Sequence, residues 1–385
     1  PYKGSWKIPT TEERVQKITL PDGREGEYLT DRLTDEALAL IEKNREKPFF
    51  LYFPYYAVHT PLQARKELVS RFSRIPKSER QGSPVYAAMG NHEALLRVFK
   101  DGSEYGVEVD RWPYATESAE AAFARWFAHP LNGPEVSDPR RPTYKENVYS
   151  FQYGCVKSIV FNNNYWTSNQ SKLYGGSPEG YLMEDQLRWI ASELEKAEAD
   201  PSVRYVFLIA QEPIFPNGGH LEDSMWYSGD NDVRARVYTD GKLVPEKEGM
   251  IEVRNRFVTM VSGSRKVAAV LGADEHAYHR LLVTKDVPVG IVEKDDKDNN
   301  GKIELTKKET CSTLPGLKFS TWFLVSGGGG APFYAEEDTP WNSYWTRKAD
   351  PAERRRGFYY SSQENLLMIE ASAGKISARV YNLHG

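Results

Sequence analysis

The sequence predicts an α/β protein, because short buried strands alternate along it with an amphipathic helix. Residues 156–161 and 205–210 are continuous apolar runs of the length that buried strands have. Between them, residues 183–197 place Leu187 and Ile190 on one face of a helix. A strand, a helix and a second strand in succession are typical of a sheet that carries helices on its faces.

The N-terminal region repeats this pattern on a smaller scale. Thr34 provides a capping signal for a helix over residues 34–47, and the apolar run 49–53 follows directly as a buried strand. A polar stretch, 74–83, then separates this region from the rest of the chain. We therefore expect two domains, residues 1–83 and residues 84–385.

Three further segments complete the predicted core. Residues 266–271 and 321–326 read as strands that end in loops with unusual composition. Near the C-terminus, apolar residues alternate on both sides of a turn at Ala373–Gly374, which predicts a β-hairpin.

Composition excludes some classes of function. With 385 residues, 40% of them hydrophobic, the chain can bury a sizeable core, and a net charge of -4 gives no footprint for nucleic acid. Two cysteines are too few for a multi-thiolate metal site, although they leave one disulfide open. No apolar stretch reaches the length of a membrane span. The oligomeric state stays open, and we favour a periplasmic or secreted location.

The tetrapeptide Gly90-Asn91-His92-Glu93 is the first candidate site. An asparagine oxygen is a reasonable ligand for a metal cation, and a neighbouring histidine can protonate a leaving group. The acid that follows can orient this histidine. The alternative is structural, with Asn91 as the N-cap of a short helix.

A second candidate site follows the strand 266–271. Asp274 and His276 are two residues apart, so an extended backbone would point both side chains into one cavity. His279 and Arg280 come soon after. The alternative is a solvated turn that an aspartate caps.

The order of these motifs resembles the calcineurin-like metallophosphoesterases over residues 84–385. The tetrapeptide is followed by the segment 149–154, by Glu212-Pro213 after a strand, and by the late Asp274-x-His276. The resemblance implies a two-sheet sandwich flanked by helices. It also implies one or two divalent metal ions of the Fe, Mn or Zn type, and a coordinated hydroxide that attacks phosphorus.

Roles in that family carry over to matching positions of this chain. Asn91 would bind a metal, His92 would be the acid beside the leaving group, and Glu93 would support it. Asp274 and His276 match the family's final metal-binding loop.

The remaining assignments from this resemblance are less direct. Gln211 stands where the family has a metal-binding histidine, and the nearby His220 would compensate. His279 and Arg280 are candidates for binding the phosphate or sulfate group. The family's upstream Asp-x-His and Gly-Asp-x-x-Asp motifs, which supply further ligands, do not occur before residue 90.

What stands upstream instead, over residues 3–89, resembles an internal part of sulfatases. The local sequence around His59-Thr60-Pro61 carries this resemblance, which implies that His59 contacts a sulfate group. The sulfatase nucleophile signature and its aspartate-rich calcium site are absent from the sequence. We interpret the chain as a chimera of two families that are joined near Gly90.

A separate pattern suggests calcium. Asp296, Asp298 and Asn300 alternate before a glycine, as the oxygen ligands of a calcium loop do. Lys307 replaces the glutamate expected at the twelfth position, and a polar hairpin loop is the alternative.

Three functions therefore stay open at this point. The first is metal-dependent hydrolysis of a small phosphate ester, as monoester or diester. The second is hydrolysis of a sulfate ester, and the third is a catalytically weak binding protein with an incomplete metal site.

Overall fold

The chain divides into two units, Pro1–Gly82 and Ser83–Gly385. The computed structural model describes residues 86–94, 118–136, 138–168, 171–303, 311–328, 333–363, 365–372 and 374–381, together with Asp35, Ala39, Glu42 and Thr116. Asp35, Ala39 and Glu42 are helical, within the helix expected over residues 34–47. The strand expected over 49–53 lies outside the described residues.

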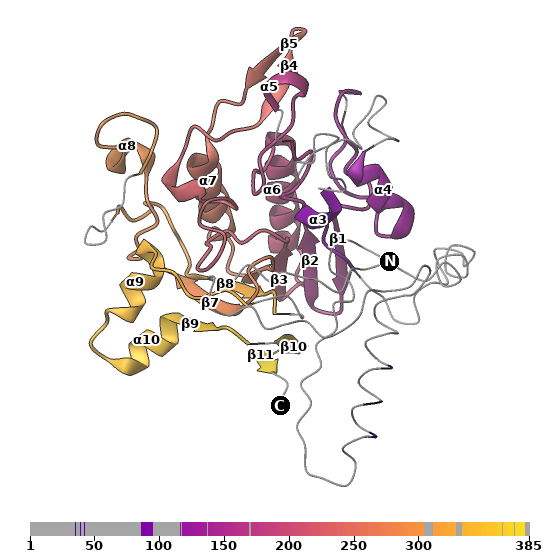
Figure 1. Ribbon diagram of the computed structural model, residues 1–385. Coiled ribbons are helices and arrows are strands. Elements are labelled where there is room, and N and C mark those ends of the chain that lie inside the picture. The colour runs from indigo at the N-terminus through magenta and orange to yellow at the C-terminus, as the bar shows by residue number, and fades with distance from the viewer. Residues whose placement is uncertain are drawn as a thin grey trace. The chain divides into compact units, whose positions relative to one another are not determined.

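A seven-stranded mixed sheet forms the centre of the second unit (Figure 1). Its strand order is β1-β2-β3-β6-β8-β7-β9, and the pairs β2–β3, β3–β6 and β6–β8 are parallel. The outer pairs β1–β2, β7–β8 and β7–β9 are antiparallel. The strands are β1 (Tyr149–Tyr153), β2 (Val156–Val160), β3 (Tyr205–Ile209), β6 (Val267–Gly272), β7 (Tyr278–Val283), β8 (Thr321–Ser326) and β9 (Phe358–Ser361).

Two helices cover one face of this sheet. Parallel strands need long crossover connections, and here α6 (Glu184–Ala199) joins β2 to β3 while α7 (Met250–Val261) lies between β3 and β6. Ile190 of α6 and Phe257 of α7 are fully buried in the main hydrophobic core, beside strand residues such as Leu208. This core fixes the sheet from which the loops of the site project.

A two-stranded sheet lies against the other face. It is the hairpin of β10 (Leu366–Ser372) and β11 (Lys375–Tyr381), paired antiparallel. Its apolar residues pack on Phe207, Ala269 and Leu324 of the large sheet. The predicted arrangement of two sheets with helices outside is therefore confirmed, although the second sheet has only two strands.

Smaller elements surround these layers. The described helices are α3 (Asn91–Ala94), α4 (Ala119–Trp126), α5 (Ser171–Tyr174), η2 (Tyr227–Gly229), α8 (Val292–Asp295), α9 (Pro340–Thr346) and α10 (Pro351–Gly357), and the hairpin β4 (Arg236–Thr239)–β5 (Lys242–Pro245) stands apart from the sheet. The strands predicted over 156–161, 205–210, 266–271 and 321–326 and the helix predicted over 183–197 agree with the structure to within two residues at each end.

Two further expectations can be compared with the structure. Cys155 and Cys311 are both free, so the disulfide that the sequence left open is not formed. Within the described ranges, no helix is both long enough and apolar enough to cross a membrane.

Candidate functional site

The loops that follow the parallel strands meet at one edge of the large sheet. Asn164 comes after β2, Gln211 after β3 and Asp274 after β6. The carboxyl ends of neighbouring parallel strands lie at the same edge, which is where α/β proteins place their sites. Asn91 lies beside these residues in the fold, although it belongs to α3 near the start of the second unit.

The side-chain amide of Gln211 lies at the centre of this cluster. Its Nε2 donates hydrogen bonds to Asn91 Oδ1 at 3.1 Å and to Asp274 Oδ1 at 2.5 Å. Its Oε1 accepts from the backbone amide of Asn91 at 3.2 Å and from Asn164 Nδ2 at 2.6 Å. This orientation of the amide satisfies all four contacts, whereas the turned amide would oppose N–H to N–H and oxygen to oxygen. Asn91, Asn164, Gln211 and Asp274 are hereafter the strand-end cluster.

The turn at Gly90 brings Asn91 into this cluster. A Cβ atom at Gly90 would lie 2.8 Å from Glu93 Oε2 and 3.3 Å from Gln211 Cγ, so a side chain there would displace the Glu93 carboxylate and crowd Gln211. Glu93 Oε2 accepts a hydrogen bond from the amide of Gly90 at 2.9 Å and fastens the turn. His92 is exposed beside the cluster, and its backbone amide donates to Asn91 Oδ1 at 2.9 Å.

His220 brings a positive charge to the cluster. Its Nδ1 lies 2.9 Å from Asp223 Oδ1 and 3.1 Å from Asp274 Oδ2. Burial lowers the pKa of His220, but the hydrogen bond to Asp223 and the charge of Asp274 outweigh it and raise the pKa to about 9. His220 is therefore protonated at neutral pH and pairs with the cluster's aspartate.

Buried carboxyl groups nevertheless outnumber the cations around the cluster. Burial, with the charges of Asp223 and Asp274, raises the pKa of Glu179 to about 7. Burial and the charge of Asp274 raise the pKa of Glu212 well above its usual range, and burial raises the pKa of Asp274 itself. Groups whose pKa is raised in this way either hold protons or attract a cation.

Three buried oxygen atoms in or beside the cluster make no hydrogen bond with any described residue, and one of them, Asp274 Oδ2, has only its ion pair with His220. The other two are Asn164 Oδ1 and Glu212 Oε1, and both of these side chains are almost fully buried. An unsatisfied buried oxygen is costly, so each such atom calls for a partner such as water or an ion. The strand-end cluster thus combines excess carboxyl groups with open acceptors.

His276 lies beside the cluster through an aromatic contact. Its ring stacks face to face on Tyr334 at 4.5 Å, and the ring of His220 meets Tyr334 edge-on at 5.3 Å. Asp274 has φ 63°, in the left-handed region that aspartate tolerates, so the segment is not extended as the two-residue spacing predicted. That expectation about the backbone was wrong, because the chain turns sharply after β6.

His279 and Arg280 point to opposite faces of the sheet, as neighbours on a strand must. His279 is 1% exposed, and its Nε2 is bonded to Glu275 Oε2 in a buried pair. Glu275 Oε1 accepts from the amides of Asn217 and Gly218. On the other face, the guanidinium of Arg280 lies 5.2 Å from the centre of the Trp322 ring. The structure therefore does not bring these two predicted anion-binding residues together.

The candidate calcium loop is closed by its own hydrogen bonds. Asp296 accepts from the amides of Asn300 at 3.0 Å and Gly301 at 2.9 Å, and Asp298 Oδ2 accepts from Asn300 Nδ2 at 3.0 Å. Asn300 Oδ1 accepts from the amide of Lys302 at 2.8 Å. These contacts are those of a polar turn, and calcium binding by the loop stays a prediction. His59 lies outside the described residues, and its predicted contact with sulfate stays a prediction as well.

The donor atoms of the cluster decide which metal they fit. Within the described ranges, no group of three or more His, Cys, Asp or Glu residues is placed to hold a metal ion. The candidate metal ligands are the side-chain amide oxygens of Asn91 and Gln211 and the carboxylate oxygens of Asp274. Such oxygens suit Mn²⁺ or Mg²⁺ better than Zn²⁺, and an ion of this kind uses one or two carboxylates with water and substrate phosphate. These oxygens are of the type that one such cation uses, although in this structure Gln211 Nε2 donates to those of Asn91 and Asp274, and metal binding by the cluster stays a prediction. The described residues do not assemble the two-metal centre that the resemblance implied.

Sequence reasoning overlooked four residues of this site. Asn164 and Glu212 belong to segments that carried the family resemblance, but neither was chosen as a site residue. Glu179 and Asp223 lie in loops with no recognisable motif, and only the folded chain brings them near Asp274.

Comparisons with known proteins agree with both resemblances. Residues 2–106 match the family model described as Sulfatase, a range that extends past the expected junction and includes Gly90–Glu93. The chain is 24% identical over 196 residues to the acid sphingomyelinase-like phosphodiesterase 3b of Mus musculus. This alignment covers 47% of the chain and 38% of the mouse protein, so the chain spans well under half of that relative.

Two solved structures show a slight likeness in fold. The purple acid phosphatase PPD1 from yellow lupin (Lupinus luteus) seeds is 14% identical with a TM-score of 0.37, covering 77% of this chain and 38% of its own. A structure of PhoD is 13% identical with a TM-score of 0.36, covering 78% and 53% respectively. The chain thus joins a segment that matches the sulfatase model to a sequence similar to a phosphodiesterase.

Proposed function

We propose that the chain is a divalent-metal-dependent hydrolase of phosphate esters, monoesters or diesters, acting at the strand-end cluster. The observation that carries the proposal is the convergence of Asn91, Gln211 and Asp274, three positions that the motif order assigned to one site, at the carboxyl edge of the sheet. The similarity to a mouse phosphodiesterase supports the same chemistry.

Electrostatics favour a cation at this place. The carboxyl groups of Glu179, Glu212 and Asp274 all have raised pKa values, because burial disfavours their charged forms and because they lie near one another, while His220 opposes the shift at Glu179 and Asp274. A phosphate ester alone would add negative charge to this region and would be repelled. A divalent cation would offset the charge of both the carboxylates and an anionic substrate.

Each residue then has a defined task. Asn91 and Asp274 would hold the cation through their oxygens, and Gln211 keeps these two side chains adjacent. When bound, a divalent cation neutralises charge on the phosphoryl group and lowers the pKa of water. Burial raises the pKa of Asp274, and protonated His220, 3.1 Å from its Oδ2, opposes that shift and favours the ionised form. His92, exposed at the start of α3, would give a proton to the leaving group.

A second candidate is a binding protein with little or no turnover. It is favoured by the two N–H contacts from Gln211, because an amide donor there satisfies the oxygens of Asn91 and Asp274 without any metal. A third candidate, a sulfate-ester hydrolase, is favoured by the match of residues 2–106 to the sulfatase model. Sulfate-ester hydrolysis would depend on His59, the residue that the sulfatase resemblance assigns to contact with sulfate.

One experiment separates the three candidates. The purified full chain is stripped with a chelator, reloaded with Mn²⁺, Mg²⁺ or Zn²⁺, and assayed on aryl phosphate monoesters, aryl phosphate diesters and aryl sulfates. We expect phosphate turnover that the chelator abolishes and Mn²⁺ restores. Metal content below one ion per chain without turnover would instead establish the second candidate, and turnover of sulfate alone would establish the third.

Matched variants locate the activity. Asp274→Asn and Asn91→Ala should each reduce turnover by roughly 100-fold or more, the size that loss of one transition-state contact commonly has. Asp298→Asn, in the candidate calcium loop, is the control and should leave turnover unchanged. Equal loss in all three variants would mean that the strand-end cluster is not the site.

A further inference from the structure

A cavity of about 550 Å³ lies between the hairpin β10–β11 and the large sheet, on the face opposite α6 and α7. Side chains of two packed sheets normally interdigitate and leave few voids larger than a water molecule. Small residues line it from both layers, Ala268 and Ala269 on β6 and Ser377 and Ala378 on β11. The gap follows from the sequence, because these side chains are too short to fill the space between the layers.

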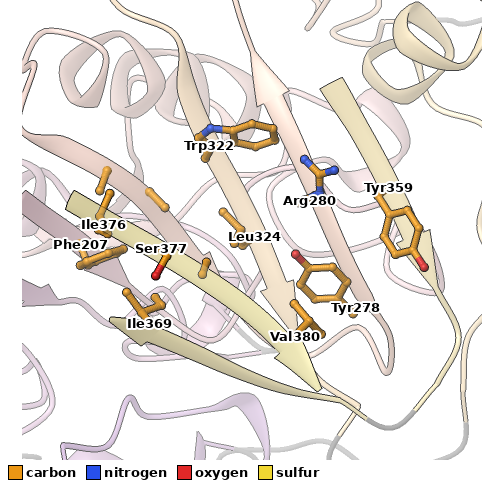
Figure 2. A pocket seen from close by; sticks show the side chains of 13 residues that line it. Phe207, Tyr278, Arg280, Trp322, Leu324, Tyr359, Ile369, Ile376, Ser377 and Val380 are labelled. Carbon is orange, nitrogen blue, oxygen red and sulfur yellow. The ribbon is translucent and has the colours of Figure 1, made fainter. Parts of the chain in front are cut away.

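The lining of the cavity changes character from one end to the other (Figure 2). Phe207, Ile369 and Ile376 gather at one end, while Tyr278, Arg280 and Tyr359 gather at the other. Most ligand sites are concave, largely apolar and equipped with a few placed polar groups, and this volume is in their usual range. The cavity therefore has an apolar end and a cationic end.

Arg280 is held in place as the cationic group. Its guanidinium lies over the Trp322 ring, and its Nη2 donates to the backbone carbonyl of Arg355 at 2.6 Å. A guanidinium has five N–H donors and keeps its charge at any physiological pH, so it is suited to bind a carboxylate or a similar anion. That contact places Arg280 beside the last turn of α10, where Arg354 and Arg356 are also exposed.

We propose that this cavity binds an amphipathic anion, an alkyl-chain carboxylate, with its chain between the two sheets and its head group at Arg280. The chain would replace water along the apolar end, and the head group would meet the positive charge at the other end. The site is separate from the strand-end cluster, because Arg280 projects from the face of the sheet opposite to that of His279 and Glu275. Binding of this anion can therefore be tested independently of the proposed hydrolase activity.

Calorimetric titration of the full chain with decanoate and with 1-decanol tests the proposal. We expect decanoate to bind at one site per chain, and decanol to bind roughly tenfold more weakly because it lacks the charge. Arg280→Gln should remove that difference, whereas Arg280→Lys, which keeps the charge, should retain part of it. Ala378→Leu should weaken both ligands by filling the gap from the exposed hairpin.

Arg379→Gln is the matched control, since Arg379 lies on the same strand, does not line the cavity and pairs with the exposed Glu370. It should bind decanoate as the unmodified chain does. A thermal melt of each variant checks that it is folded. Absent or unsaturable decanoate binding, equal affinity for decanol, or affinity that neither Ala378→Leu nor Arg280→Gln alters would overturn the proposal.

Discussion

Two polar regions lie next to each other at the carboxyl edge of the sheet, and they differ in how completely their atoms are paired. The Glu275–His279 pair is closed, since both carboxylate oxygens of Glu275 accept hydrogen bonds and the ring of His279 is fully buried. The strand-end cluster is open, with unsatisfied oxygens on Asn164 and on the neighbouring Glu212. A closed polar network stabilises a fold, whereas an open one has capacity left for a ligand.

The largest expected effect separates these two roles by stability. Glu275→Ala leaves His279 and the amides of Asn217 and Gly218 without their partner, and loss of one member of a buried pair costs about 3–5 kcal/mol of unfolding free energy. Urea unfolding measures this change. Asp274→Ala, in the open cluster, should cost less than half as much, and equal losses at the two positions would contradict the distinction.

The sequence could anticipate the open region better than the closed one. Gln211 and Asp274 follow strands that periodicity alone located, and parallel strands bring their following loops together. Asn91 was found from its motif. The closed pair was unforeseen because Glu275 and His279 carry the same residue types as ligands, and only burial reveals that they belong to the core. The left-handed turn at Asp274 and the approach of Glu179 depend on long-range packing, which spacing cannot report.

A second prediction concerns Glu120 on α4, a buried carboxyl group that, like the strand-end cluster, has an oxygen without a hydrogen bond. Its Oε1 accepts from the amide of Trp166 at 2.6 Å, and its Oε2 makes no hydrogen bond with the described residues. Burial raises its pKa to about 7, although the hydrogen bond from Trp166 opposes the shift. Because the folded state holds this proton more tightly than the unfolded state, unfolding free energy should fall as pH rises from about 4.5 to about 7.

The size of this pH effect is at most about 3.5 kcal/mol, from about 1.4 kcal/mol for each pKa unit. Unfolding free energies measured at pH 4.5, 6 and 8 should show the decline in the unmodified chain. Glu120→Gln, which carries no titratable proton, should show a shallower slope by that amount. An unchanged slope would assign the pH dependence to other groups and remove Glu120 from the comparison.

A third prediction asks whether the open region can be made to hold metal more tightly. Gln211→His replaces an amide whose N–H groups face Asn91 and Asp274 with a nitrogen ligand suited to transition metals. We expect roughly tenfold tighter Zn²⁺ binding, measured by competition with a chromophoric chelator. Asn217→His, beside the closed pair, is the comparison variant and should produce no gain; a gain there would blur the distinction between the regions.

The smallest expected effect concerns Glu93, which sequence analysis placed with the catalytic residues and which the structure ties to the backbone of Gly90. If its main task is to fasten that turn, Glu93→Ala should cost about 1 kcal/mol of unfolding free energy, the value of an ordinary hydrogen bond. Glu93→Gln keeps an acceptor oxygen and should restore both stability and any phosphoesterase turnover. Turnover that Glu93→Gln fails to restore, in a variant as stable as the unmodified chain, would place this carboxylate among the groups that act on the substrate, because only the negative charge distinguishes the two side chains.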